Sequence, residues 1–282
     1  MTNSLKSHTL GAPGATLYYE TRGSGPLLVM IPGGPTDAGV FGGLAECLAD
    51  RYRVAAYDPR GNSRSIFDGA PKEQDLDVHG DDAARLIEVL GGGPAFVFGS
   101  SGGAQIGLNL AARHPERVRT LVAHEPPCVR MLADSSEIVA GTEAVYDAYR
   151  AEGIGSAMQK FMQMAGMGDG PPRQDGPPGQ GAPPPEAMAA MARIGANMDY
   201  FLAHGIRPIS FYTPDVPALR AGPVRVVVGV GESSKGQLAY RAAGALAEAL
   251  EAETVTFPGD HGGYGAHPQA FAETLDWVLR GG

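Results

Sequence analysis

The sequence has few cysteines and no long apolar run. Only Cys47 and Cys128 occur among its 282 residues, too few for a disulfide framework, and their spacing matches no metal-binding motif. No apolar run approaches the length of a membrane span, and Met1–Ser7 lacks the apolar core of a signal peptide. These absences predict reduced thiols, no metal site, no membrane association and a location in the cytoplasm.

Excess basic charge is also missing. The chain carries 22 lysines and arginines against 31 aspartates and glutamates, a formal net charge of −9. This balance argues against nucleic acid or an anionic membrane surface as a partner. The hydrophobic share of 43% is that of a globular protein that buries a sizeable core. The oligomeric state stays open.

Short segments rich in β-branched and aromatic residues alternate with longer segments of helical periodicity toward both ends of the chain. The expected strands are Ala15–Thr21, Leu27–Ile31, Arg53–Tyr57, Ala95–Phe98, Thr120–Ala123, Val224–Val228 and Thr254–Phe257. The expected helices are Asp81–Leu90, Ala104–Arg113, Gly236–Leu250 and Gln269–Leu279. Strands that are apolar on both faces predict an α/β fold, with a mostly parallel central sheet covered by helices on both faces.

This alternation stops between about residues 126 and 223. Apolar helical segments without any clear strand occupy this region, at Glu137–Glu152, Ser156–Met167 and Glu186–His204. Residues 168–185 are rich in proline and glycine and cannot form a packed element, so we expect a flexible loop. The pattern predicts a core of residues 1–125 and 224–282, with an inserted helical cap at residues 126–223.

Methionine is concentrated in the predicted cap. Seven of the ten methionines lie there: Met158, Met162, Met164, Met167, Met188, Met191 and Met198. Methionine adapts its shape to irregular apolar space. We expect most of these side chains to pack between cap helices, with a forgiving apolar substrate pocket as the alternative interpretation.

The stretch Gly99-Ser100-Ser101-Gly102-Gly103 joins a predicted strand to a predicted helix. A serine with glycines two positions before and after it, at such a turn, is typical of a nucleophile elbow. Ser101 has this glycine pair and Ser100 does not. The turn would expose the Ser101 hydroxyl and aim the Gly102 N–H at the place where an oxyanion forms. The competing interpretation is a glycine-rich turn with incidental serines.

A serine nucleophile needs a general base. His261 lies in the loop after the last predicted strand, from which a side chain can reach the carboxyl edge of a parallel sheet. His124, at the end of another predicted strand, is the second candidate. Four further histidines stand at expected helix or cap positions: His79, His114, His204 and His267.

Glycines also follow the strand Leu27–Ile31, in Pro32-Gly33-Gly34-Pro35. They free a backbone N–H to face the serine, whereas Pro35 has no N–H to offer. We expect the N–H groups of Gly34 and Gly102 to form an oxyanion hole, and a plain tight loop is the alternative.

With these residues the chain resembles the serine-type α/β-hydrolases over nearly its whole length outside the predicted cap. Pro32-Gly33-Gly34-Pro35 stands where that family usually has His-Gly-X-Pro, so Pro32 replaces the histidine. Ser101-Gly102-Gly103 followed by Ala112–Val118 is a common continuation in the family. The resemblance implies the α/β-hydrolase fold with its lid at the predicted cap, and no metal or organic cofactor.

A second stretch carries the resemblance further. Tyr57–Ser65 is similar to the family's Asp-X-Arg-Gly-X-Gly-X-Ser loop, with Ser63 in place of a glycine. Within this stretch we expect Asp58 to brace the loop through Arg60 and to take no part in chemistry.

The acid of the implied triad has two candidates. By resemblance it follows the strand Val224–Val228, where Glu232 takes the place of the more usual aspartate. A minority of the family carries it after the preceding core strand, where Glu125 lies, and lactonases that act on zearalenone resemble this arrangement. Both positions keep the order Ser, acid, His. We favour Glu232 because two of its neighbours are small and glycine-rich, and we keep Glu125 as the alternative.

Together these features predict a hydrolase that cleaves a carboxylic ester, lactone or thioester through an acyl-enzyme on Ser101. The methionine-rich cap favours an apolar small-molecule substrate. A serine at the elbow, instead of an aspartate, argues against epoxide hydrolase and haloalkane dehalogenase chemistry. The alternatives are a cofactor-free lyase, oxygenase or cyclase on the same scaffold, and a non-catalytic ligand receptor.

Overall fold

The computed structural model describes residues 4–166, 185–252 and 254–282. Its strands are β1 (Lys6–Ala12), β2 (Ala15–Arg22), β3 (Leu27–Ile31), β4 (Arg53–Tyr57), β5 (Ile66–Phe67), β6 (Ala95–Ser100), β7 (Val118–His124), β8 (Arg225–Gly231) and β9 (Thr254–Phe257). They form one sheet in the order β1-β2-β4-β3-β6-β7-β8-β9, with β5 paired to β2. The pairs that involve β2 are antiparallel, and all pairs from β4 to β9 are parallel. The predicted mostly parallel sheet is confirmed.

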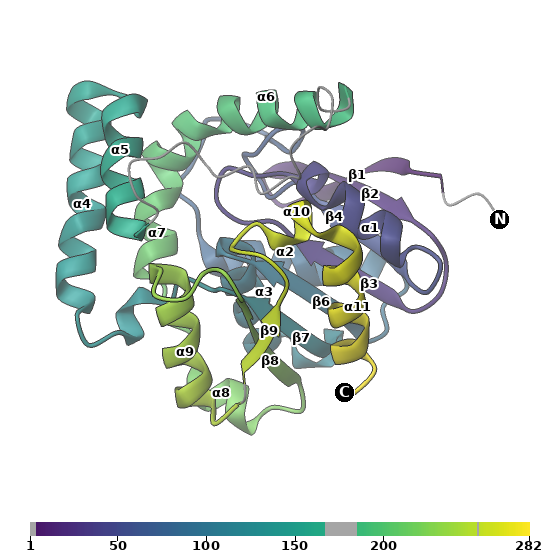
Figure 1. Ribbon diagram of the computed structural model, residues 1–282. Helices are drawn as coiled ribbons and strands as arrows, with labels where there is room; N and C mark the ends of the chain where they lie inside the picture. The colour runs from purple at the N-terminus through teal and green to yellow at the C-terminus, as the bar shows by residue number, and fades with distance from the viewer. Residues whose placement is uncertain (1–3, 167–184, 253) are drawn as a thin grey trace, which may run out of the picture.

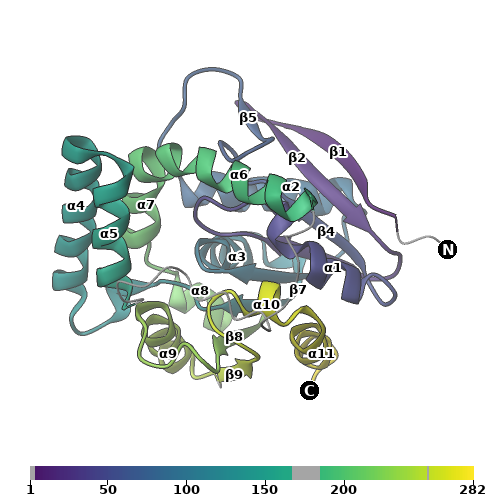
Figure 2. The same cartoon turned by 45° about the horizontal axis from the view of Figure 1, so that its top comes forward.

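Alternate side chains of the central strands enter two separate cores. In β3, Val29 and Ile31 belong to one core, and Leu28 and Met30 belong to the other. The first core draws on α2 (Leu76–Val89), α3 (Gly102–Arg113), α8 (Val216–Ala221) and α9 (Leu238–Leu250). The second draws on η1 (Ala38–Phe41), α1 (Gly42–Leu48) and α11 (Pro268–Leu279). Helices therefore cover both faces, because every central strand is apolar on both (Figures 1 and 2).

The chain between β7 and β8, called the insertion below, is helical in its described residues. It contains η3 (Val129–Met131), α4 (Ser135–Glu152), α5 (Ile154–Ala165), α6 (Pro185–Tyr200), the π-helical turn η4 (Phe201–Gly205), α7 (Ile206–Phe211) and α8. α4 and α5 form a hairpin beside the core, and α6 crosses above the N-terminal half of the chain (Figure 1). No strand lies in its described residues, 126–166 and 185–223. The division into a core and a cap at residue 223 stays a prediction, and α8 packs with the sheet layer through Leu219.

The methionines of the insertion divide into two groups. Met158, Met162, Met164 and Met198 are half-buried, as expected for side chains between helices. Met188 and Met191 are more than half exposed on α6, so the packing interpretation is wrong for these two. Met167 and the proline- and glycine-rich loop predicted at residues 168–185, apart from Pro185 at the start of α6, lie outside the described residues.

Both cysteines lie apart from each other in the fold and form no disulfide. Cys47 and Cys128 are free thiols, and burial raises the pKa of Cys128 to about 12. Within the described ranges, no helix combines the length and apolarity that crossing a membrane requires. In the same part of the chain, no three His, Cys, Asp or Glu side chains are grouped to hold a metal ion. Two short turns, η2 (Pro115–Arg117) and α10 (Gly263–Ala266), complete the fold.

Candidate active site

Ser101 occupies a sharp turn between β6 and α3. Its backbone has φ 57° and ψ −128°, a region that strains any residue with a side chain. A Cβ atom at Gly99 would overlap the carbonyl oxygen of Gly103, and one at Gly103 would overlap that of Ile31. The two glycines that flank Ser101 are therefore required for the turn to pack, and the strand-turn-helix geometry expected at Ser101 is present.

The order of the strands gathers the other candidate residues around this turn. β3, β6, β7 and β8 are adjacent and parallel, so their carboxyl ends meet at one edge of the sheet. Gly34 follows β3, Glu125 follows β7, and His261 follows β9. The turn is tied to β7, because the Ser101 N–H donates to the His124 carbonyl at 2.9 Å.

The glycines after β3 pack directly on the elbow. A Cβ atom at Gly33 would lie 2.5 Å from the Ser100 carbonyl oxygen and 2.6 Å from the Gly102 nitrogen. Gly34 has φ +55°, and its nitrogen lies 3.3 Å from the position of a Cβ atom on Gly102. Gly34, Ser101 and Gly102 line the same cavity. The two N–H groups expected to hold an oxyanion thus lie side by side at the serine.

Glu125 is the carboxylate that contacts His261. Its side chain is fully buried, and its Oε2 lies 2.6 Å from Nδ1 of His261. The Gly231 N–H donates to Oε1 at 2.9 Å, so both carboxylate oxygens are satisfied. Burial by itself raises the pKa of Glu125, but the hydrogen bond and charge of His261, together with the Gly231 N–H, hold it below its ordinary value.

The structure corrects the sequence-based preference for Glu232. Glu232 is exposed, its N–H donates to the Phe257 carbonyl at 3.0 Å, and no hydrogen bond or ion pair joins it to His261 in the described residues. A Cβ atom at Gly231 would lie 2.9 Å from the Asp260 carbonyl oxygen, so the small residue before Glu232 is explained by close packing against the His261 loop. The glycine-rich surroundings of Glu232 reflect this packing, and β8 approaches the site through the Gly231 N–H.

His124, the second candidate base, lies beneath the site. Its ring is fully buried against Phe98, Phe257 and Phe271, and its Nδ1 is 3.3 Å from the Ser100 hydroxyl. Burial lowers the pKa of His124 to about 3, so the imidazole is neutral over the physiological range. It does not border the cavity that contains Ser101. Its position therefore disqualifies it as the base.

A cavity of about 90 Å³ lies over Ser101 and His261. This is several times the ~10–15 Å³ that one buried water needs. Its wall combines the carboxyl edge of the sheet with apolar side chains of the insertion and α9: Ile138, Phe161, Met164, Phe201, Ile209 and Leu238. Among the methionines of the described insertion, only Met164 borders it. No hydrogen bond joins Ser101 to His261 in the described contacts.

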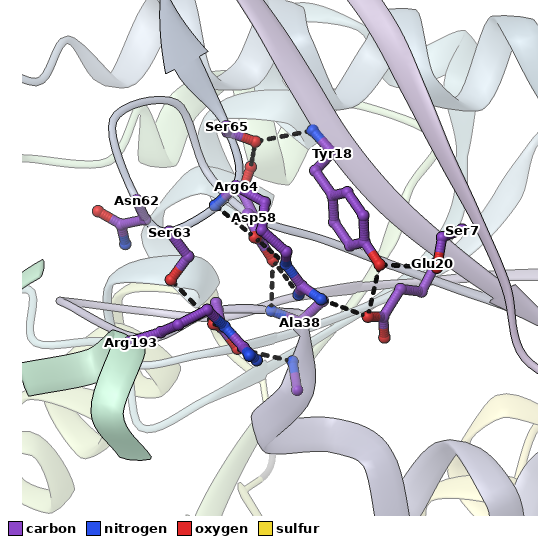
Figure 3. Close-up of polar contacts among 12 residues, drawn as sticks. Ser7, Tyr18, Glu20, Ala38, Asp58, Asn62, Ser63, Arg64, Ser65 and Arg193 are labelled. Atoms are coloured by element: carbon purple, nitrogen blue, oxygen red, sulfur yellow. Dashed lines mark hydrogen bonds and ion pairs between the residues drawn. The ribbon is translucent and has the colours of Figure 1, made fainter. Parts of the chain in front are cut away.

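The loop at Asp58–Ser65 supports the site in a way the sequence did not reveal. Buried Asp58 accepts hydrogen bonds from the Ala38 N–H and from the backbone and side chain of Arg64 (Figure 3). The expected Asp58–Arg60 brace is wrong, because Arg60 instead pairs with Asp82 at 2.6 Å.

This loop also presents Asn62 to the glycines after β3. The Nδ2 group of Asn62 donates to the carbonyls of Gly34 and Thr36, both at 2.9 Å. Asn62 is fully buried. No sequence signal marked this residue, since the contact depends on how two loops at different strand ends meet.

Comparisons with known proteins give relatives in sequence and in fold. A family model described as the alpha/beta hydrolase fold matches residues 26–164. An uncharacterized hydrolase of Bacillus subtilis, YraK, is 35% identical over 284 residues, covering 98% of this chain and 97% of that protein. A zearalenone hydrolase of Cladophialophora bantiana is 38% identical over 128 residues, 44% of this chain and 48% of that protein.

A solved structure shares the fold over nearly the whole chain. The crystal structure of an E-2-(acetamidomethylene)succinate hydrolase superimposes with a TM-score of 0.69 at 23% identity, covering 98% of this chain and 100% of the other. At this identity the likeness extends to the arrangement of helices and strands.

Proposed function

Since this chain belongs to the α/β-hydrolase fold family, we propose that it is a serine hydrolase of carboxylic esters, with lactones and thioesters in the same reaction class. Ser101 is the nucleophile, His261 the general base and Glu125 the acid that orients it. The N–H groups of Gly34 and Gly102 receive the oxyanion. The observation that carries the proposal is the buried Glu125–His261 pair beside a strained elbow serine.

In the first half of the reaction His261 accepts the Ser101 proton while Oγ attacks the substrate carbonyl. Glu125 accepts the Nδ1–H, which leaves Nε2 as the free, basic nitrogen. The carbonyl oxygen becomes negatively charged and is stabilised by the two backbone N–H groups. When the intermediate collapses, His261 returns its proton to the leaving oxygen or sulfur, and the acyl group stays on Ser101 as an ester.

In the second half water replaces the leaving group. His261 removes a proton from water, hydroxide attacks the acyl carbonyl, and the same N–H groups hold the second oxyanion. His261 then protonates Ser101 as the acid leaves. Glu125 stays ionised throughout, because its depressed pKa favours the charged form, and it stabilises the imidazolium in both steps.

The cavity favours an apolar acyl or lactone part. Its insertion wall is made of Phe161, Met164, Phe201 and Ile209, with few polar groups near the serine. A cyclic ester is supported by the similarity to a zearalenone hydrolase across 44% of this chain. We therefore place apolar esters and lactones ahead of thioesters.

A fluorophosphonate probe and p-nitrophenyl esters test this proposal together. We expect stoichiometric labelling at Ser101, ester turnover, and loss of both in Ser101→Ala. Labelling without turnover of any ester, lactone or thioester would favour the lyase, oxygenase or cyclase alternative. Absence of both in the wild-type protein would refute the hydrolase mechanism and leave the ligand receptor.

A further inference from the structure

Helix α6 contacts the loop that carries Gly34, through a side chain that is almost fully buried. Asn197 of α6 is 6% exposed and lies against the loop Pro32–Asp37. Its Nδ2 donates to the Pro35 carbonyl at 2.8 Å and to the Ser63 hydroxyl at 2.8 Å. Its Oδ1 accepts from the Ser63 N–H at 2.7 Å. A buried amide with all these bonds made is a specific contact between the insertion and the core.

One helical turn earlier, Arg193 reaches the end of the same loop. Its guanidinium pairs with Asp37, with Nε 2.5 Å from Oδ2 and Nη2 3.3 Å from Oδ1. Asp37 is fully buried and also accepts from the Gly39 N–H and the Ser63 hydroxyl, both at 2.8 Å. Figure 3 shows Arg193 extending from α6 toward Ser63 and the loop. The carboxylate of Asp37 is therefore shared by α6 and by the core.

Ser63 completes the contact, and its identity departs from the glycine that the family resemblance implies. Its φ of 49° is a backbone conformation that favours glycine, so a serine here carries strain. The serine hydroxyl donates to Asp37 and accepts from Asn197, two bonds a glycine could not make. These four residues, Asp37, Ser63, Arg193 and Asn197, are called the α6 latch below.

The latch acts on the segment that follows the Gly34 N–H, whose own peptide group is held by Thr36: the Gly33 carbonyl accepts from the Thr36 N–H at 3.2 Å and from the Thr36 hydroxyl at 2.5 Å. Gly34 has φ +55° and no side chain, so its N–H direction depends on restraint of the neighbouring carbonyls. Asn62 restrains the Gly34 carbonyl from the core side at 2.9 Å. Asn197 restrains the Pro35 carbonyl from α6. The peptide groups Gly34–Pro35 and Pro35–Thr36 are thus each held through their carbonyl oxygen, the first by Asn62 and the second by Asn197.

The same helix continues into the wall of the cavity. Phe201, directly after α6, lies 3.8 Å from the position of a Cβ atom on Gly34 and borders the cavity over Ser101. One continuous helical segment therefore carries two latch residues, Arg193 and Asn197, and a surface against which an acyl group would lie. Movement of α6 would displace the cavity wall and release the Pro35 carbonyl together.

We propose that Asn197 is a positioning residue for the reaction, and that the α6 latch holds the Gly34 N–H in the direction the oxyanion requires. This inference rests on the proposed function, because it assigns a role in stabilising an oxyanion. Complete loss of an oxyanion donor costs about 10²–10³ in kcat in hydrolases. Releasing the loop misaligns the donor without removing it, so the effect should be smaller.

The central test compares Asn197→Ala with wild type on a p-nitrophenyl ester. We expect kcat to fall by about 10–100-fold, a fraction of that full donor loss, while KM changes little, because the donor acts mainly in the transition state. Inhibition by a trifluoromethyl ketone, which forms a tetrahedral oxyanion on the serine, should weaken by a similar factor. Met191→Ala, an exposed change on the same helix, is the matched control and should leave kcat, KM and inhibition unchanged.

Ser63→Gly provides an independent variant that is expected to fold. It relieves the backbone strain and removes only the bridging hydroxyl, so kcat should fall while the thermal midpoint holds or rises. In the double variant Asn197→Ala/Ser63→Gly, kcat should fall by less than the product of the two single fold-losses, since both changes act through one hydrogen-bond network.

The outcomes separate this inference from the proposed function. If the wild-type protein is active and folded Asn197→Ala or Ser63→Gly has the same kcat and the same ketone inhibition, the proposed role of the latch is overturned and the hydrolase function stands. A rise in KM with kcat and ketone inhibition unchanged also overturns it, because that result assigns α6 to substrate binding. A wild-type protein that neither labels with fluorophosphonate nor turns over esters overturns both.

Discussion

Replacing Glu125 with glutamine would test the assignment of the acid most directly. The two carboxylate oxygens have different partners, His261 Nδ1 at 2.6 Å and the Gly231 N–H at 2.9 Å. Glutamine has one oxygen and one NH₂ group. If the oxygen keeps Gly231, the NH₂ faces Nδ1, which must then accept, so the imidazole proton moves to Nε2. If the oxygen keeps His261, the NH₂ meets the Gly231 N–H and two donors are left facing each other in a buried site.

The first arrangement removes the base that Ser101 needs, and the second keeps the tautomer but loses the carboxylate charge that stabilises the imidazolium. With the proton on Nε2, His261 has no free nitrogen directed at the serine, and the equivalent tautomer error costs about 10⁴ in kcat in serine proteases. That factor corresponds to about 5 kcal/mol of lost transition-state stabilisation, at about 1.36 kcal/mol per tenfold. The change conserves size, so most of the loss should fall on kcat and little on KM.

Glu232→Gln is the matched control, because the Glu232 side chain is exposed and makes no described hydrogen bond or ion pair with His261. Steady-state hydrolysis of a p-nitrophenyl ester should show a loss of about 10³–10⁴ in kcat for Glu125→Gln and none for Glu232→Gln. Circular dichroism and thermal melting establish that both variants are folded. Loss of activity in Glu232→Gln with retention in Glu125→Gln would refute the assignment and restore the sequence-based preference.

Further predictions follow from the same contacts. Asp37→Asn should reduce the acid sensitivity of folding in urea melts. Burial raises the pKa of Asp37, but hydrogen bonds from Arg193, Ser63 and the Gly39 N–H outweigh it and lower the pKa from 3.8. The ionised Asp37 therefore stabilises the fold above that pH, and this stabilisation is lost as the pH falls below it; equal acid sensitivity in both proteins would contradict this. Gly103→Ala should cost about 3 kcal/mol or more in unfolding free energy, because the added Cβ overlaps the Ile31 carbonyl. Gly244→Ala in α9, with open space around it, should be neutral or stabilise by up to about 1 kcal/mol. A larger loss of stability in Gly244→Ala than in Gly103→Ala would contradict the packing argument. Met164→Ala should enlarge the cavity and so raise kcat/KM for long acyl esters relative to acetyl esters. If the wild-type protein prefers acetyl esters and the variant keeps that preference, the acyl group lies outside this cavity.

Local sequence was sufficient where the backbone itself imposes the residue. The glycines around Ser101 are required by close backbone contacts, Gly99 with Gly103 inside the turn and Gly103 with Ile31 at the end of β3, and their spacing identified the elbow. The central strands were evident because both of their faces are buried. By contrast, the strand β1 was missed, since Lys6–Ala12 is largely exposed and pairs only along one edge of the sheet. β5, with two residues, gave no pattern to detect.

The acid could not be identified from local sequence. Glu125 and Glu232 both follow strands that end at the catalytic edge, and both keep the same chain order relative to His261. Only the tertiary structure distinguishes their side chains. Glu125 follows β7 with φ 45°, its N–H donates to the Gly229 carbonyl, and its side chain is buried. The Glu232 N–H donates to the Phe257 carbonyl of β9, and its side chain is exposed to solvent. The pairing of neighbouring strands therefore decides which of the two glutamates faces His261.

The sequence by itself determined the fold class, the elbow at Ser101, the base candidate His261 and the glycines that follow β3. The strands and the Ser101 turn depend on residue types that the local backbone requires, so a short stretch of sequence records them. His261 and the glycines after β3 were identified from their positions directly after predicted strands. Tertiary structure alone decided that Glu125 faces His261, that Asn62 and Asn197 hold the Pro32–Asp37 loop, and that Met188 and Met191 face solvent while Met164 borders the cavity. These depend on contacts between segments up to 162 positions apart, as for Asn197 and Pro35, and such contacts exist only once the strands are ordered and the insertion is packed.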